Sequence, residues 1–157
     1  MADDHRWLTP DEQASWRAFV SSVQDVMAHL DADLAHHGLA TGDYGVLVRL
    51  SEAPDEQMRM CDLAAELRLS PSGLTRRLDG LVRNGWVERT ACTSDRRVSY
   101  AHLTAAGREK LRAAAPDHVA SVRRHLLEPL GPRGVIQLGT LFGCVRAHHD
   151  RVDETVG

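Results

Sequence analysis

The chain has 157 residues, of which 43% are hydrophobic and 26% are charged, values typical of a globular domain with a buried core. Its 19 basic and 22 acidic side chains give a formal net charge of −3, so the overall charge does not point to a polyanionic partner. No apolar run approaches the roughly 18 residues of a membrane span, and residues 1–6 lack the basic-then-apolar order of a secretory signal, so we expect a cytoplasmic protein without membrane contact.

A long first helix is predicted over residues 10–37. Thr9 is suited to the cap, Pro10 to the first helical position and Glu12 to the return bond of a capping box. An apolar stripe with helical spacing follows, formed by Trp16, Phe19, Val20, Val23, Met27, Leu30 and Leu34. Gly38 ends the helix, which needs a partner along its length, either another long helix or another subunit.

Two short helices separated by a tight polar turn are predicted in the middle of the chain. A helix from Thr41 to near Pro54 precedes them, and Arg59-Met60 suggests a very short strand. The first short helix begins at about Cys61. The second is capped by Ser70 and ends at Asn84-Gly85. This order is typical of a helix-turn-helix.

Residues 86–90 and 98–103 are rich in β-branched and aromatic side chains and predict two strands. The polar segment 92–97 between them is typical of the tip of a hairpin, or wing. Thr104 then caps a helix in which Pro116 predicts a kink, and Leu130-Gly131-Pro132 breaks the chain. The last helix carries apolar residues at helical spacing, together with one histidine: Leu138, Leu141, Phe142, Val145 and His149.

The predicted fold is mainly α with a small β-wing: a winged helix-turn-helix over residues 41–103, embedded in a helical dimerisation framework of residues 10–37 and 104–154. We treat 1–157 as a single unit. The terminal helices present more apolar surface than a module of about 60 residues can cover, and a twofold homodimer with interlocked terminal helices would bury it.

The order of these elements resembles the multiple-antibiotic-resistance regulator (MarR) family of winged-helix transcription factors over roughly residues 10–150. The stretches that match are Leu63-Ala64-Ala65-Glu66-Leu67, the segment from Ser70 to Leu78, Gly85-Trp86-Val87-Glu88-Arg89, and the segment from Asp95 to Thr104. The resemblance implies a dimeric transcriptional regulator that binds an inverted-repeat operator in double-stranded DNA. We expect a repressor, with an activator or a constitutive, ligand-blind binder as the alternatives.

The basic side chains of the chain gather in its middle. Residues 1–54 carry a net charge of −6, residues 55–112 of +3 and residues 113–157 of zero. The start of the second short helix is expected to enter the major groove with small or hydrogen-bonding groups, namely Ser70, Ser72, Gly73, Thr75 and Arg76. Arg76 suits a bidentate bond to guanine, whereas Arg77 and Arg83 are expected to meet phosphates. The alternative is that Arg76 and Arg77 form an ordinary solvated face.

The wing tip carries Asp95, Arg96 and Arg97. In the family, the arginine of an Asp-x-Arg motif enters the minor groove while the aspartate orients it. The resemblance therefore gives these roles to Arg97 and Asp95 and leaves Arg96 for a phosphate. A simple surface turn with an ordinary ion pair is the alternative.

Family members commonly release DNA when a small aromatic or anionic effector binds between the helical region and the winged helix. Candidate lining residues are Trp16, His29, Tyr44 and Arg49, with Arg49 as a partner for an anion. Core packing is the preferred interpretation of Trp16, which lies on the apolar stripe of its helix, and an acidic neighbour is the alternative for Arg49.

Other sensing chemistries have weaker support in the sequence. Cys61 and Cys144 are expected to be buried inert thiols, and Cys92 to be exposed in the wing. The nine histidines include no pair spaced four residues apart, so a metal-responsive regulator, like a redox-responsive one, is only an alternative.

No sequence motif of a hydrolase, a nucleotide-binding loop or a metalloprotease is present, so we expect neither an enzyme nor a cofactor. A winged helix that docks a protein instead of DNA is the remaining alternative. An apolar exposed face on the second short helix, the recognition helix, would favour a protein partner, whereas a positively charged face would favour DNA.

Overall fold

The computed structural model describes residues 6–91 and 98–156. Helix α1 (Pro10–Ala35) is followed by α2 (Thr41–Glu52), a 3-10 turn (Pro54–Glu56) and strand β1 (Gln57–Arg59). Helices α3 (Met60–Glu66) and α4 (Pro71–Arg83) precede strands β2 (Val87–Ala91) and β3 (Ser99–Leu103). Helix α5 (Ala105–Val122), a π-helical turn (Arg123–Leu127) and α6 (Glu128–Val156) complete the chain.

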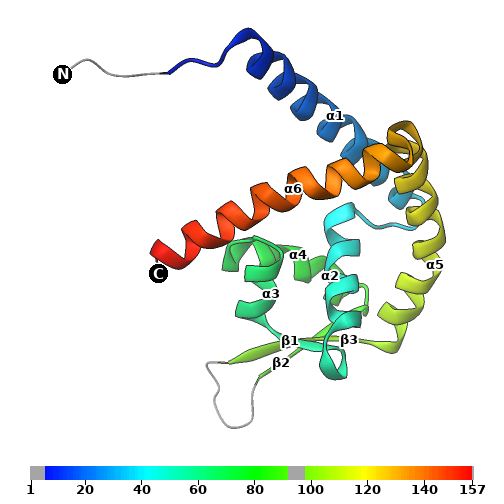
Figure 1. Ribbon diagram of the computed structural model, residues 1–157. Helices are drawn as coiled ribbons and strands as arrows, with labels where there is room; N and C mark the ends of the chain where they lie inside the picture. Colours follow the sequence, from blue (N-terminus) through cyan, green and yellow to red (C-terminus); the bar gives the residue numbers. More distant parts are fainter. Residues whose placement is uncertain (1–5, 92–97, 157) are drawn as a thin grey trace.

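The elements form a compact module with two helical arms. In Figure 1, α2, α3, α4 and the sheet lie together, and α5 runs along their side. Helices α1 and α6 leave the region where α5 ends as two long arms, and the α6 arm runs back toward the turn after α3, where Asp150 lies 3.2 Å from Arg68. The mainly α architecture with a small sheet agrees with the fold class that the sequence predicts.

Side-chain caps fix the starts of three helices where the sequence predicts them. The Thr9 hydroxyl accepts from the Glu12 amide at 3.3 Å, and Glu12 accepts from the Thr9 amide at 2.7 Å, which completes the capping box. Ser70 caps α4 by accepting from the Gly73 amide, and Thr104 caps α5 by accepting from the Gly107 amide. Each cap satisfies a backbone amide that the helix itself leaves without a partner.

The three-stranded sheet has the order β1-β3-β2, with both pairs antiparallel. The short strand predicted at Arg59-Met60 is Gln57–Arg59, and Met60 already begins α3. Trp86 is not part of β2. Its amide donates to the Leu81 carbonyl and its carbonyl accepts from the Thr104 amide, so its backbone bonds belong to the turns on either side.

The core lies inside the compact module. Side chains from α2, α3, α4 and the sheet are almost fully buried there, among them Val46, Leu47, Leu50, Leu63, Leu74, Leu78, Leu81, Val87 and Ala101. Burial of each large aliphatic side chain contributes about 1.5–3 kcal/mol, so this cluster supplies most of the stability of the module.

Helix α5 continues through Pro116 with helical backbone, and the irregular turn comes later, at Arg123–Leu127. The predicted break at Gly131 is confirmed, since this residue has φ +65° and ψ 171°. In the residues described, no helix is both long and apolar enough to span a bilayer.

Candidate nucleic-acid interface

Helix α4 has one buried and one exposed face. Leu74, Leu78 and Leu81 pack into the core, while Ser72, Thr75, Arg76 and Arg83 stay exposed. The helix therefore offers its polar face to a partner without giving up its anchor in the module.

The first turn of α4 is compact and rich in hydroxyl groups. The hydroxyls of Ser70 and Ser72 lie 3.2 Å apart, and Thr75 donates to the Pro71 carbonyl at 2.9 Å. Gly73 presents no side chain at all, so a base edge can approach the backbone closely here. These residues of the predicted major-groove surface lie side by side in the structure.

The three arginines of α4 have different surroundings. Within residues 6–91 and 98–156, the Arg76 side chain has no hydrogen-bond or ion-pair partner. Arg83 donates to the Asp79 carbonyl of its own helix at 3.2 Å and remains exposed. Arg77, expected to face phosphate, is instead half-buried against α2, where it forms an ion pair with Asp43 at 3.4 Å. Arg76 thus keeps all its donors available.

Arg89 on β2 holds the wing against α4, a role that the sequence does not reveal. Its guanidinium donates to the Thr75 carbonyl at 2.7 Å and lies 2.9 Å from the Asp79 carboxylate. These bonds tie the first wing strand to the exposed side of the helix. For Arg89 the sequence suggested only a place in the strand predicted over residues 86–90 and in the stretch that resembles the family, because nothing local signals a partner ten or more residues earlier.

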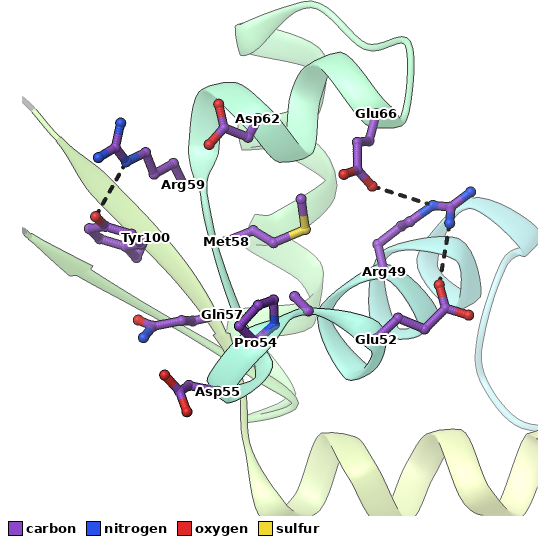
Figure 2. A pocket seen from close by; sticks show the side chains of 11 residues that line it. Arg49, Glu52, Pro54, Asp55, Gln57, Met58, Arg59, Asp62, Glu66 and Tyr100 are labelled. Atoms are coloured by element: carbon purple, nitrogen blue, oxygen red, sulfur yellow. Dashed lines mark hydrogen bonds and ion pairs between the residues drawn. The ribbon is translucent and has the colours of Figure 1, made fainter.

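A groove of about 340 Å³ lies where α3, α4 and β3 meet, next to the start of the recognition helix. It is lined by Arg59, Met60, Cys61, Pro71, Leu74, Thr75, Val98 and Ser99. Arg59 stands at its edge, where its Nε lies 3.4 Å from the Tyr100 hydroxyl (Figure 2). Hydrogen bonding to Tyr100 raises the pKa of Arg59, so its positive charge is secure. Arg59 is a basic residue of this surface that sequence reasoning missed.

The wing-tip candidates Asp95, Arg96 and Arg97 lie outside the described residues, as does Cys92. The strands on either side are in place, with Val87 opposite Leu103 and Ala91 opposite Ser99.

Arg49, an effector candidate, lines a cavity of about 600 Å³ between α2, α3 and β1. Figure 2 shows its guanidinium between two carboxylates, at 3.3 Å from Glu52 and 3.7 Å from Glu66. Asp55 and Asp62 add two further acidic side chains to the lining. The cavity is therefore of mixed charge, and Arg49 has the acidic neighbours that the alternative interpretation expects.

The other effector candidates lie in separate surroundings. The Trp16 ring is 57% exposed and lies 5.8 Å from the ring of Phe19. His29 stacks on His125 at 4.3 Å, and Tyr44 lies 4.2 Å from His118. Burial raises the pKa of Tyr44 and lowers that of His118. Neither the groove beside α4 nor the cavity around Arg49 brings two of the four candidates together.

Two thiols differ from expectation. Cys61 and Cys144 are both exposed, so the prediction of buried thiols is wrong. Cys61 is the second residue of α3, in which Leu63 and Ala64 are the buried residues, and Cys144 lies on the α6 arm, outside the buried core. Over the described ranges 6–91 and 98–156, no three His, Cys, Asp or Glu side chains gather as metal ligands.

A large apolar hollow of about 860 Å³ lies between the arms α1 and α6. Its lining includes Phe19, Val23, Met27, Leu138 and Phe142, and the rings of Phe19 and Phe142 lie 5.4 Å apart. Several of these side chains are about 40% exposed, so the hollow is an apolar surface in contact with solvent.

Comparisons with known proteins point to one family. Residues 41–99, from α2 to the start of β3, match the model of the MarR family. The transcriptional repressor YetL of Bacillus subtilis is 32% identical over 123 residues, which span 76% of this chain and 72% of YetL. AbsC of Streptomyces coelicolor, a MarR family transcriptional regulator, shares 39% identity and has a TM-score of 0.87, with 92% of this chain and 98% of AbsC covered. Sco3205 of the same organism, solved in complex with DNA, shares 38% identity and has a TM-score of 0.86 over 90% of this chain and 89% of its own.

Proposed function

This chain belongs to the MarR family of DNA-binding transcriptional regulators, and from that premise we propose which of its residues read an operator and how. The start of α4 enters the major groove, where Ser70, Ser72, Gly73, Thr75 and Arg76 face base edges. Arg83 contacts a phosphate. The observation that carries this proposal is the exposed face of α4, on which Arg76 has no partner among the described side chains.

We propose that the wing supplies the second contact. Arg97 enters the minor groove, Asp95 orients it and Arg96 meets a phosphate. Support comes from the bonds of Arg89, which join β2 to Thr75 and Asp79 of α4. Because wing and helix are tied together, both can engage adjacent grooves as one rigid surface.

We propose that two copies pair through the hollow between α1 and α6 and so bind DNA as a homodimer. The regions 10–37 and 104–154 then form the dimerisation framework, and residues 41–103 the reading module. A twofold dimer presents two α4 helices about one DNA turn apart, roughly 34–36 Å, so its operator is an inverted repeat. The proposed role is binding rather than catalysis, carried out in the cytoplasm as a repressor.

Selection from a pool of random duplexes tests this function. The purified protein is expected to enrich an inverted repeat whose half-sites are separated by about 10 base pairs, centre to centre. Enrichment of a single half-site would contradict the dimer, and enrichment of no sequence at low salt would contradict the function itself. Binding to the enriched duplex should also weaken steeply with added salt, because phosphate contacts release counterions.

A further inference from the structure

Arg77 differs from the other arginines of α4 because its guanidinium contacts another helix. Its Nη1 lies 3.4 Å from Asp43 Oδ1 on α2, and about a third of each side chain is exposed. Residues 43 and 77 are 34 positions apart, so this pair connects the recognition helix to the beginning of α2.

The guanidinium occupies a space that only a glycine leaves open. A Cβ at Gly42 would lie 1.9 Å from Arg77 Nη1 and 2.3 Å from its Cζ. Gly42 is the second residue of α2, where glycine is a poor helix former. The absence of a side chain at Gly42 therefore leaves room for the Arg77 guanidinium.

Asp43 is held in place to receive this charge. Its Oδ2 accepts from the Ala40 amide at 3.3 Å, while Oδ1 faces Arg77. Next to it, Asp31 of α1 accepts from the Thr41 amide at 2.7 Å. Hydrogen bonding from Thr41 lowers the pKa of Asp31, and the charge of Arg77 lowers it further. The seat of Arg77 is thus a fixed, acidic junction between α1 and α2.

Taking the proposed DNA-binding function as given, we propose that Arg77 is a positioning residue that sets the orientation of α4 and makes no phosphate contact. Burial of Leu74 and Leu78 decides which face of α4 meets the core, since the interior is close-packed. Two polar ties add directional restraints on either side of that face. Arg77 fastens α4 to α2 on one side, and Arg89 fastens it to β2 on the other.

Gly42→Ala tests this role without changing the charge of the protein. The added methyl group displaces the guanidinium from Asp43, and we expect about tenfold weaker binding of the duplex enriched by selection. Gly45→Ala is the matched control, because a Cβ there meets only Leu67 Cδ2, at 4.0 Å. Thermal unfolding should show both variants folded. In an Arg77→Ala background, Gly42→Ala should have no additional effect.

A phosphate contact would give the opposite results. If Arg77 reached DNA, Gly42→Ala would release it and leave the affinity at or above that of the wild type. Asp43→Asn also distinguishes the positioning role of Arg77 from a phosphate contact, because the two roles predict opposite changes in DNA affinity. Removal of a negative charge favours DNA binding at long range, whereas loss of the tie weakens it.

The salt dependence gives a second, independent measurement. Arg83→Ala should reduce the slope of log affinity against log salt by about 0.9 for each phosphate that it no longer neutralises, while Arg77→Ala should lower affinity and leave the slope unchanged. Equal reductions of the slope in the two variants would overturn the positioning role. If instead the wild type and Gly45→Ala fail to bind any duplex, the proposed function fails, and the two failures are distinguishable.

Discussion

The three arginines of α4 and Arg89 of β2 fall into two groups according to their partners. Arg77 and Arg89 are joined to carboxylates of the protein, at 3.4 and 2.9 Å. Arg76 and Arg83 have no carboxylate partner among the described residues, so their charges are directed to solvent. Arginines in one short segment thus have different roles, and the role of each depends on the group that it contacts.

Arg76→Ala should reduce discrimination between sequences. A bidentate bond to guanine contributes about 1–3 kcal/mol of specificity, and an alanine retains none of it. Fluorescence anisotropy with the enriched duplex and a scrambled one should show the two affinities converging. Arg112→Ala on α5 is the control, because the partner of that arginine is the exposed Glu109 of the same helix. An unchanged affinity ratio in Arg76→Ala would remove Arg76 from base recognition.

Arg97→Ala should weaken operator binding by about tenfold or more, a loss of about 1.4 kcal/mol, without unfolding the protein. A narrow A·T-rich minor groove concentrates negative potential, which attracts an inserted arginine. Replacing the A·T pairs opposite the wing by G·C should therefore weaken the wild type more than Arg97→Ala. A gel-shift titration that gives the same affinity for both proteins would exclude the minor-groove role.

At the level of helices and strands, local signals were sufficient for most boundaries. The caps at Thr9, Ser70 and Thr104 and the break at Gly131 depend on residues within four positions, and all are present in the structure. Ties between distant elements leave no such signal. Examples are Arg77 with Asp43, and Arg108, whose Nε donates to Glu56 at 2.7 Å. The sequence therefore predicts the exposed face of α4 but not what orients it.

Helix α5 is joined to the reading module at Gly107. The Gly107 amide donates to Thr104 Oγ1, and the Thr104 hydroxyl donates to the Gly85 carbonyl at 2.6 Å. A Cβ at Gly107 would fall 2.0 Å from the backbone carbonyl oxygen of Trp86. Since backbone cannot move aside as a side-chain end can, only glycine allows this approach.

Gly107→Ala should therefore destabilise the protein, by about 1–3 kcal/mol as in other overpacked sites. Gly80→Ala in α4 is the matched control, since a Cβ there has no neighbour within 4 Å. We expect it to raise stability by roughly 0.5–1 kcal/mol, because alanine favours a helix. Urea unfolding measures both changes. Equal stability of the two variants would contradict the close approach of α5.

In the whole molecule, recognition and assembly occupy different parts. The arginine-rich face and most of the buried core belong to residues 41–103, and Leu34 of α1 and Ala114 of α5 contribute to the core as well, whereas other positions of α1 and α6 carry exposed apolar side chains. Among these are Trp16 at 57%, Val23 at 44% and Val145 at 51% exposure. A single chain rarely leaves so much apolar surface uncovered. In the proposed dimer, apolar contacts of α1 and α6 therefore stabilise the pairing of the two chains. This pairing sets the distance between the two α4 helices on DNA.

Phe142→Glu should disrupt assembly of the dimer without unfolding the module that binds DNA. In the dimer, a carboxylate at position 142 would be taken out of water among the apolar side chains of the hollow, whereas in the single chain, where Phe142 is 41% exposed, it stays in contact with solvent. We expect a folded monomer by sedimentation and, because two linked half-sites bind far more tightly than one, an operator affinity reduced by about 10²- to 10⁴-fold. Gln137→Glu adds the same charge on the opposite face of α6 by helical spacing and should leave both properties unchanged. A Phe142→Glu variant that still sediments as a dimer would place the interface elsewhere, whereas a monomer with undiminished affinity would show that each reading module binds DNA on its own.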